Sequence, residues 1–156
     1  MVARATHEEE GFRLSPEQRV AWSGFLRVHA SIVKELDAKL QAKHGLPLSS
    51  YDLLVQLSLA PGGRMQMYKL AEAVFLSRSA LTRAVDRLER QGLLERCRGT
   101  ADPRQVFAAI SERGLERLAE TTPAHLTDVR ERFLDRLSQV QLKQLAKIWE
   151  CLVEDE

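Results

Sequence analysis

The side chains with the clearest chemical capacity are the hydroxyls and arginines between Ser77 and Arg90. On a helical wheel at about 100° per residue they share one face, with Ser79 and Thr82 near the N-terminal end and arginines further along. Short hydroxyl side chains can approach base edges, an arginine can grip guanine O6 and N7, and the helix N-terminus attracts phosphate. This pattern predicts a helix that reads a DNA major groove, although a solvated amphipathic helix would show the same two faces. The other face is apolar and holds Leu81, Ala84, Val85 and Leu88.

A β-hairpin is expected directly after this helix. Residues 93–98 and 105–110 fit two short strands around a turn at 99–103. An arginine at the hairpin tip, such as Arg104, has the right size to enter a narrow minor groove, and Asp102 can hold it by a charge-assisted hydrogen bond. A turn salt bridge of small energetic value would use the same two residues. The order of helix and tip arginine favours DNA binding.

The middle of the chain is basic and its ends are acidic. Residues 64–104 hold nine Lys or Arg against five Asp or Glu, whereas the whole chain has a net charge of +1. Such a distribution suits local contact with a polyanion, although ordinary surface charge would also produce it. We therefore predict double-stranded DNA as a partner and Asp102 as a support of the wing. The predicted DNA contacts are Ser77, Arg78, Ser79, Thr82, Arg83, Arg87, Arg98 and Arg104.

Serine residues mark the expected helix starts. The first and last form capping boxes with a glutamine three residues later, and Pro16 suits a first helical position. Pro123 is expected to kink or interrupt the helix that contains it. The expected N-caps are Ser15, Ser49, Ser77, Ser111 and Ser138. The expected helices cover 15–45, 49–60, 68–74, 77–92, a stretch from 111 and a stretch from 138, with three residues of strand near 64–66.

This order predicts a mainly α fold with a small β-hairpin wing, that is, a winged helix-turn-helix. Residues 46–114 would form the DNA-binding lobe, and residues 15–45 and 115–156 a helical dimerisation lobe. The long terminal helices are too apolar on one face to remain single, so they should pack on each other or on a second copy. Residues 1–14 are expected to be a disordered or loosely ordered arm.

The types and spacing of several residues in this sequence resemble those of the MarR family of bacterial regulators. The resemblance covers roughly residues 15–153, and Ile110-Ser111 replaces the family's Leu-Thr. It implies a homodimer that binds pseudo-palindromic DNA, as a repressor, and is released by a small aromatic or phenolic effector. The matching residues are Leu70, Ala71, Ser77, Ser79, Thr82, Arg83, Asp86–Glu89, Gly92–Arg96, Asp102, Arg104, Ile110–Glu112 and Gly114.

The resemblance also suggests residues for an effector site. Family ligands bind where the first helices meet the DNA-binding lobe, which implicates Trp22, His29, Tyr51 and Asp52. Ala84 stands where urate-responsive relatives carry an arginine, which argues against urate. Trp22 and His29 would equally suit a dimer core, and Asp52 would suit the first turn of a helix.

Other chemistry is poorly supported. The four histidines and the cysteines, Cys97 and Cys151, have no metal-ligand spacing, and relatives that sense oxidants carry their cysteine near the first helix. No phosphate loop, nucleophile with its base, signal peptide or membrane span is evident. We predict no enzymatic activity, no cofactor, no membrane association and a cytoplasmic location. A helical protein-interaction module without DNA binding is the alternative.

Overall fold

The computed structural model describes residues 13–99, 102 and 104–153. The chain forms two compact units, Met1–Lys34 and Glu35–Glu156, which are treated separately below. The boundary between these units lies inside one helix. The division into a helical and a DNA-binding lobe stays a prediction. Most of the predicted N-terminal arm lies outside the described residues.

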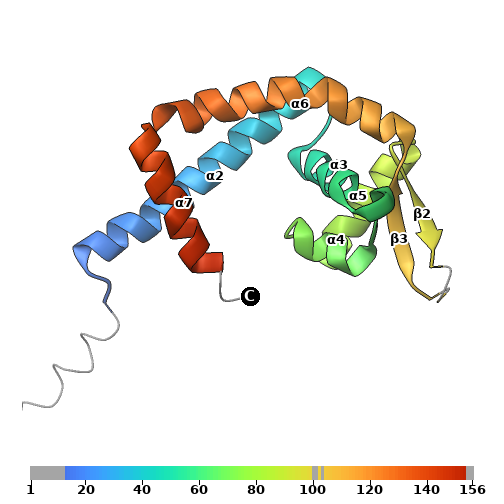
Figure 1. Cartoon of the computed structure of the whole chain (residues 1–156), viewed down its shortest axis with the longest axis horizontal. Helices are drawn as coiled ribbons and strands as arrows, with labels where there is room; N and C mark the ends of the chain where they lie inside the picture. The colour runs from blue at the N-terminus through green and yellow to red at the C-terminus, as the bar shows by residue number, and fades with distance from the viewer. Residues whose placement is uncertain (1–12, 100–101, 103, 154–156) are drawn as a thin grey trace, which may run out of the picture. The chain divides into compact units, whose positions relative to one another are not determined.

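The elements follow the predicted order. The helices are α2 (Pro16–His44), α3 (Leu48–Leu59), α4 (Met67–Ala73), α5 (Arg78–Arg90), α6 (Glu112–Arg132) and α7 (Gln139–Val153), with single turns η1 (Pro61–Gly63) and η2 (Leu134–Arg136). The strands are β1 (Arg64–Gln66), β2 (Leu94–Arg98) and β3 (Val106–Ile110), and they form an antiparallel sheet in the order β1-β3-β2. Figure 1 shows α3, α4 and α5 beside the β2–β3 hairpin.

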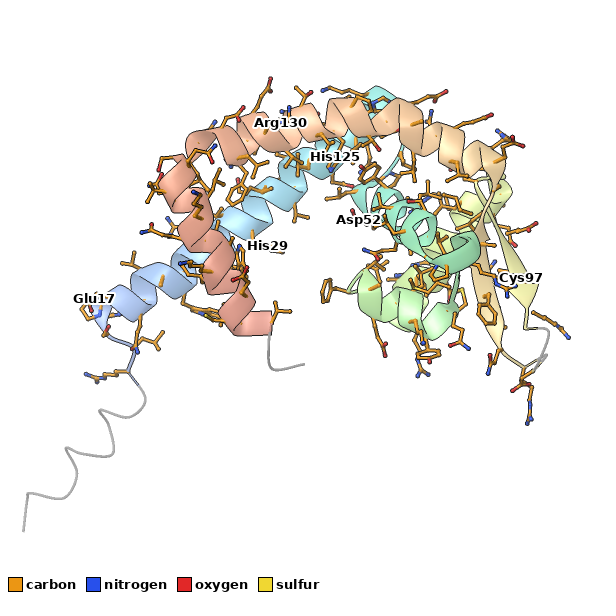
Figure 2. All side chains as sticks on the ribbon, in the orientation of Figure 1. Glu17, His29, Asp52, Cys97, His125 and Arg130 are labelled. Atoms are coloured by element: carbon orange, nitrogen blue, oxygen red, sulfur yellow. The ribbon has the colours of Figure 1, made fainter. Side chains whose placement is uncertain are left out.

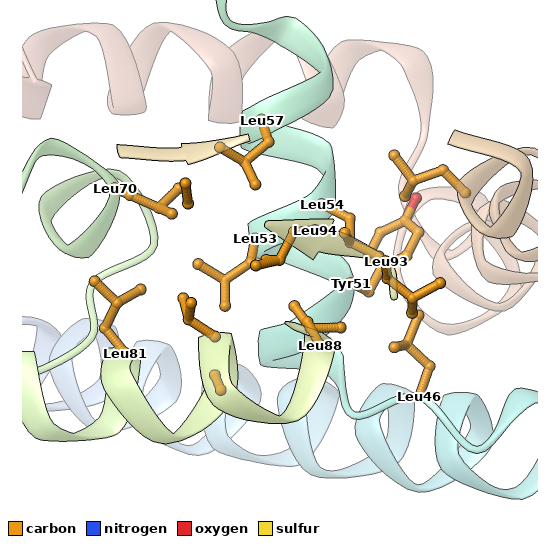
Figure 3. Close-up of a cluster of buried hydrophobic side chains, with 14 of the residues drawn as sticks. Leu46, Tyr51, Leu53, Leu54, Leu57, Leu70, Leu81, Leu88, Leu93 and Leu94 are labelled. Carbon is orange, nitrogen blue, oxygen red and sulfur yellow. The ribbon is translucent and has the colours of Figure 1, made fainter. Parts of the chain in front are cut away.

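Leucines from α3, α4, α5 and β2 build a common hydrophobic core (Figure 3). The apolar face predicted for α5 is buried, with Leu81, Ala84, Val85 and Leu88 each at most 4% exposed. From α3, Leu53, Leu54 and Leu57 meet this face and are fully buried. The core therefore fixes how α5 is rotated, and the polar face of α5 must look outward.

Local capping signals were confirmed at four of the five expected serines. Ser15 and Ser138 exchange hydrogen bonds with the glutamine three residues later, as capping boxes do. Ser77 Oγ accepts from the Ala80 amide, and Ser111 Oγ accepts from the Gly114 amide. These caps depend only on neighbours in sequence.

The start of α3 differs from the prediction. The helix begins at Leu48 after Pro47, which has no side chain that could cap it, and Ser49 is not the N-cap. Instead, Asp37 Oδ1 of α2 accepts a hydrogen bond of 2.8 Å from the Leu48 amide. The carboxylate satisfies a free amide and also complements the positive helix end. Asp37, eleven residues from Leu48 in the sequence, thus takes the place of the expected local cap.

Pro123 does not interrupt its helix, which was one of the two effects expected of it. Helix α6 runs from Glu112 to Arg132 with Pro123 inside it. A proline removes one intrahelical hydrogen bond, but packing on α3 buries Leu118, Thr121 and His125 on the same helix. Tertiary contacts on both sides of Pro123 thus maintain the helix.

No helix of the described residues is long and apolar enough to cross a membrane.

Two helical surfaces expose large apolar side chains. In the first unit, α2 exposes Val20, Trp22, Phe25, Leu26 and Val28. In the second unit, α7 buries no residue and exposes Val140, Ile148, Trp149, Leu152 and Val153. Apolar areas of this kind commonly mark protein–protein contacts.

Candidate nucleic-acid interface

The outward face of α5 carries the predicted hydroxyl and arginine side chains. Ser77, Arg78, Ser79, Thr82 and Arg83 are all exposed. Ser77 and Ser79 lie close together, with 3.3 Å between their hydroxyl oxygens, and Thr82 Oγ1 donates to the Arg78 carbonyl. No hydrogen bond or ion pair joins Arg83 to another described residue. This face therefore combines small polar groups at the helix start with an arginine that can reach outward.

The wing is attached to α5 by an ion-pair network. Arg96 of β2 pairs with Asp86 and Glu89 of α5, and the Arg96 amide also donates to Glu89 Oε1 at 3.1 Å. Burial disfavours the charged form of Arg96, but the hydrogen bonds and charges of both carboxylates outweigh it and raise its pKa. Sequence analysis did not assign these three residues a function. The sequence offered one indication of this network, namely that Arg96 lies ten residues after Asp86 and seven residues after Glu89.

The tip of the wing has the predicted arrangement. Asp102 Oδ1 accepts from the Arg104 amide at 3.0 Å and lies 3.3 Å from Arg104 Nε. The side chain of Arg104 is 93% exposed, so the pair restrains it without covering it. Arg98 is also exposed, on β2. Near the tip of the hairpin, just before β3, Gln105 Oε1 accepts from Gln66 Nε2 at 2.7 Å and links the wing to the residue before α4.

Arg87 departs from the predicted pattern. Its side chain is half-buried, and its Nη2 atom donates to Ser50 Oγ of α3 at 2.7 Å. Ser50 itself is fully buried. Arg87 therefore connects α5 to α3 within the protein, and we no longer count it among the DNA contacts.

We expect Arg87→Ala to lower the free energy of unfolding by about 1–3 kcal/mol, because it leaves the buried Ser50 hydroxyl without its charged donor. Urea unfolding would measure the change. Arg90→Ala removes an exposed arginine from the same helix and should stay within about 0.5 kcal/mol of the wild type. An Arg87→Ala variant as stable as the wild type would contradict this assignment.

The four predicted effector residues fall in two places. In the first unit, Trp22, Phe25 and His29 form a row of rings along α2, with centroids about 6 Å apart. In the second unit, Tyr51 is buried on α3, whereas Asp52 is exposed, and partial desolvation raises the pKa of Asp52. Trp22 and His29 belong to the first unit, and Tyr51 and Asp52 to the second.

Tyr51 has partners on α6 that sequence analysis missed. Its ring centroid lies 4.5 Å from that of His125, and its hydroxyl lies 3.2 Å from Thr122 Oγ1. His125 is 8% exposed, and its Nδ1 atom has no hydrogen-bond partner among the described residues. Figure 2 shows His125 on α6 and Asp52 on α3. No local pattern in the sequence indicates this contact, which joins helices more than 70 residues apart.

A buried carboxylate lies near His125. Asp128 is 5% exposed and pairs with Lys39 at 3.2 Å and with Lys43 at 2.9 Å. Burial opposes its ionisation, but the hydrogen bonds from the two lysines lower the pKa of Asp128. For His125, burial is the larger influence and lowers its pKa below 6.5, against the opposing charge of Asp128. Burial thus favours the neutral form of His125, and the two lysines favour the ionised form of Asp128.

We expect the protein to lose stability as the pH falls below about 6.5, because unfolded His125 binds a proton before folded His125 does. One such group contributes a slope of at most about 1.4 kcal/mol per pH unit. Urea unfolding between pH 7 and 5 should give a shallower slope for His125→Gln than for the wild type. His29→Gln removes an exposed histidine and serves as the control. Equal slopes for wild type and His125→Gln would refute this expectation.

Other chemical sites are not apparent in the part of the chain that is described. It contains no group of three His, Cys, Asp or Glu residues that could hold a metal ion. Cys97 is half-buried and Cys151 is exposed, and both are free thiols. A cleft beside the start of α6 contains none of the predicted effector residues. It is lined by Gln91, Leu93, Arg113, Glu116, Arg117 and Glu120.

Known proteins are similar to this chain in sequence and in structure. A family model described as MarR family matches residues 44–105. AbsC, a MarR family transcriptional regulator from Streptomyces coelicolor, is 34% identical with a TM-score of 0.83, over 92% of this chain and 96% of that chain. Sco3205, a MarR family regulator from the same organism solved in complex with DNA, is 34% identical with a TM-score of 0.85, over 92% of this chain and 89% of that chain. The HTH-type transcriptional regulator MhqR of Bacillus subtilis (strain 168) is 29% identical over 105 residues, which are 67% of this chain and 70% of that protein.

Proposed function

Because the chain belongs to the MarR family of DNA-binding transcriptional regulators, we propose that it is a repressor that binds pseudo-palindromic operator DNA as a homodimer. The observation that carries this proposal is the exposed face of α5, which holds Ser77, Ser79, Thr82 and Arg83 beside a wing tipped by Arg104. A protein bound at an operator excludes other proteins from the same DNA, which accounts for repression. We place this activity in the cytoplasm and assign the chain no enzymatic reaction.

The residues divide into three kinds of DNA contact. Ser79, Thr82 and Arg83 would face base edges in the major groove, where short hydroxyls and a bidentate arginine discriminate base pairs. Ser77, Arg78 and Arg98 would touch phosphates and set the position of the helix. Arg104 would enter the adjacent minor groove, whose narrow A·T-rich stretches attract cations, while Asp102 supports it.

Dimerisation would cover the exposed apolar side chains of α2 and α7. Trp22 and Phe25 of the first unit, and Ile148 and Leu152 of the second, are too large and too exposed for an ordinary monomer surface. A twofold dimer would present two copies of α5 to the same side of the duplex. Half-site centres should then lie about 10 bp apart, or a small multiple of that distance.

A small aromatic or phenolic effector would act through the junction of α3 and α6. Tyr51 and His125 provide two rings there, tilted at 53° with centroids 4.5 Å apart, and Thr122 Oγ1 lies 3.2 Å from the Tyr51 hydroxyl. Asp52 is the next residue of α3. Trp22 and His29, in the first unit, stay predicted effector contacts. Such a ligand weakens DNA binding only if it has different affinities for the free and DNA-bound conformations.

Selection of bound duplexes from a random pool tests the proposal directly. We expect a motif with dyad symmetry, and a log–log salt dependence of affinity whose slope reflects several phosphate contacts. Analytical ultracentrifugation at micromolar concentration should show a dimer. Selected sites without a dyad, or a stable monomer, would contradict the dimeric mode. Binding without salt dependence would favour a protein-interaction module instead.

A further inference from the structure

The turn between α4 and α5 holds an aromatic side chain in an unusual state. Phe75 is 94% exposed, more than any other large apolar side chain among the described residues. Its backbone has φ = 54°, and it is the one non-glycine residue of the described chain with a positive φ. A bulky side chain in this left-handed region is rare because its Cβ crowds the backbone.

The hydrogen bonds at the end of α4 explain why the backbone adopts this conformation. The Phe75 amide donates to the Glu72 carbonyl at 3.2 Å, and the Leu76 amide donates to the Ala71 carbonyl at 3.0 Å. This pair of bonds is a Schellman motif, which requires a left-handed residue at the position of Phe75. Glycine is the usual residue there because it has no Cβ.

The Phe75 side chain has no evident function within its own chain. The turn would form more easily with glycine, and the adjacent Leu76 already supplies the apolar contact of the motif with the core. The exposed ring adds no burial to the folded monomer. Strained residues that the fold does not require concentrate at functional sites. The ring therefore points to a binding partner outside the monomer.

The position of Phe75 identifies that partner. Phe75 lies two residues before Ser77, the N-cap of α5, and is continuous with the exposed Ser77, Arg78 and Ser79. When the N-terminal end of α5 enters a major groove, the turn before it comes to the edge of that groove. The apolar groups there are thymine methyls and the deoxyribose rings of the groove wall.

We propose that Phe75 is a DNA contact, in which its ring packs against a thymine methyl or a deoxyribose at the edge of the half-site. This inference rests on the proposed function of α5. It explains why a strained aromatic residue occupies a position that favours glycine. An apolar contact neutralises no phosphate, so its loss weakens affinity without changing the salt slope.

Phe75→Gly tests this proposal because it separates folding from binding. We expect the melting temperature to rise by roughly 2–4 °C, since glycine relieves the strain. The affinity for the selected operator should fall roughly tenfold with an unchanged salt slope, as expected for losing part of the burial of a phenyl ring. Asparagine also tolerates the left-handed region, so Phe75→Asn should lose as much operator affinity as Phe75→Gly. Phe75→Tyr keeps the ring and should bind within about twofold of the wild type.

Operator DNA with deoxyuridine in place of thymidine distinguishes the two apolar groups. If the ring packs on a thymine methyl, this substitution weakens the wild type but adds no loss for Phe75→Gly at that base. If the ring packs on deoxyribose, the wild type binds both DNAs equally and Phe75→Gly stays weak on both.

Two results would overturn the proposal. In the first, Phe75→Gly and Phe75→Asn bind the operator with wild-type affinity, whereas Arg83→Ala binds it more weakly. The proposed function would then stand, and the ring would belong to a protein-binding surface. The other is a fall in melting temperature that accompanies the affinity loss, or an equal loss in Phe75→Tyr, because either would give the ring a structural role. If Arg83→Ala also binds like the wild type, the proposed placement of α5 in the major groove fails, and with it the position argued for Phe75. Absence of salt-dependent operator binding in the wild type would make the proposed function itself fail.

Discussion

Replacing both Arg83 and Arg104 with alanine is expected to abolish specific operator binding while the protein remains folded. Arg83 lies on the exposed face of α5, opposite the buried Leu81 and Leu88, and the Arg104 side chain is 93% exposed. Neither side chain contributes to the core. The double variant should therefore melt within a few degrees of the wild type.

The two single variants should differ in how they lose affinity. Arg83→Ala should cost roughly 1–3 kcal/mol at one base-pair position if the guanidinium grips a guanine. Arg104→Ala should weaken binding broadly, flatten the preference at the outer flanks of the site and reduce the salt slope by about one. Affinities measured on a panel of single-base operator variants across a salt series would separate these effects.

A matched control addresses the loss of two positive charges. Arg27 of α2 and Arg130 of α6 are exposed arginines outside the proposed interface. The Arg27→Ala, Arg130→Ala variant changes the net charge equally and should retain nearly all operator affinity. Full affinity in the Arg83→Ala, Arg104→Ala variant would refute the mechanism. A uniform loss across sequences for Arg83→Ala would instead move base recognition to Ser79 and Thr82.

Gly114→Ala is expected to destabilise the protein severely. A Cβ atom at this position would lie 2.1 Å from the Leu93 carbonyl oxygen and 2.7 Å from Ile110 Cγ1. The backbone here has little freedom to move, because Ser111 donates from its amide to the Leu93 carbonyl and from its hydroxyl to the Gly92 carbonyl. The first turn of α6 would have to separate from the start of β2.

The expected cost is about 3 kcal/mol or more, at the upper end for overpacking, because the clash is with backbone. The melting temperature should fall by roughly 6–12 °C. Gly24→Ala is the control, since a Cβ at Gly24 meets nothing within 4 Å and alanine favours a helix by about 0.5–1 kcal/mol. Thermal unfolding of both variants measures the contrast. A Gly114→Ala variant that melts like the wild type would show that α6 can shift freely.

Features specified by residues close in sequence could be predicted. The apolar spacing of Leu81, Val85 and Leu88 determined which face of α5 is buried, and Ser77 determined where the helix begins. The wing tip followed the same rule, because Asp102 and Arg104 are two residues apart.

Features specified by distant residues could not be predicted. The cap of α3 comes from Asp37, the partner of Arg87 is Ser50, and the ring that contacts Tyr51 belongs to His125. No periodicity or short motif encodes these contacts, which depend on how the helices pack. Pro123 failed as a helix breaker for the same reason, since tertiary packing outweighed its local preference.

The ion pairs of Arg96 with Asp86 and Glu89 have a mechanical consequence for the choice of operator. They hold β2 of the wing against α5 at three backbone and side-chain bonds. In the proposed mode of binding, α5 contacts the major groove and the wing tip the minor groove, so this attachment sets the distance between the two contacts. The duplex would then have to supply the matching distance between its grooves through its own twist and bend. Sequences that deform easily to that spacing should bind better even at base pairs that no side chain touches.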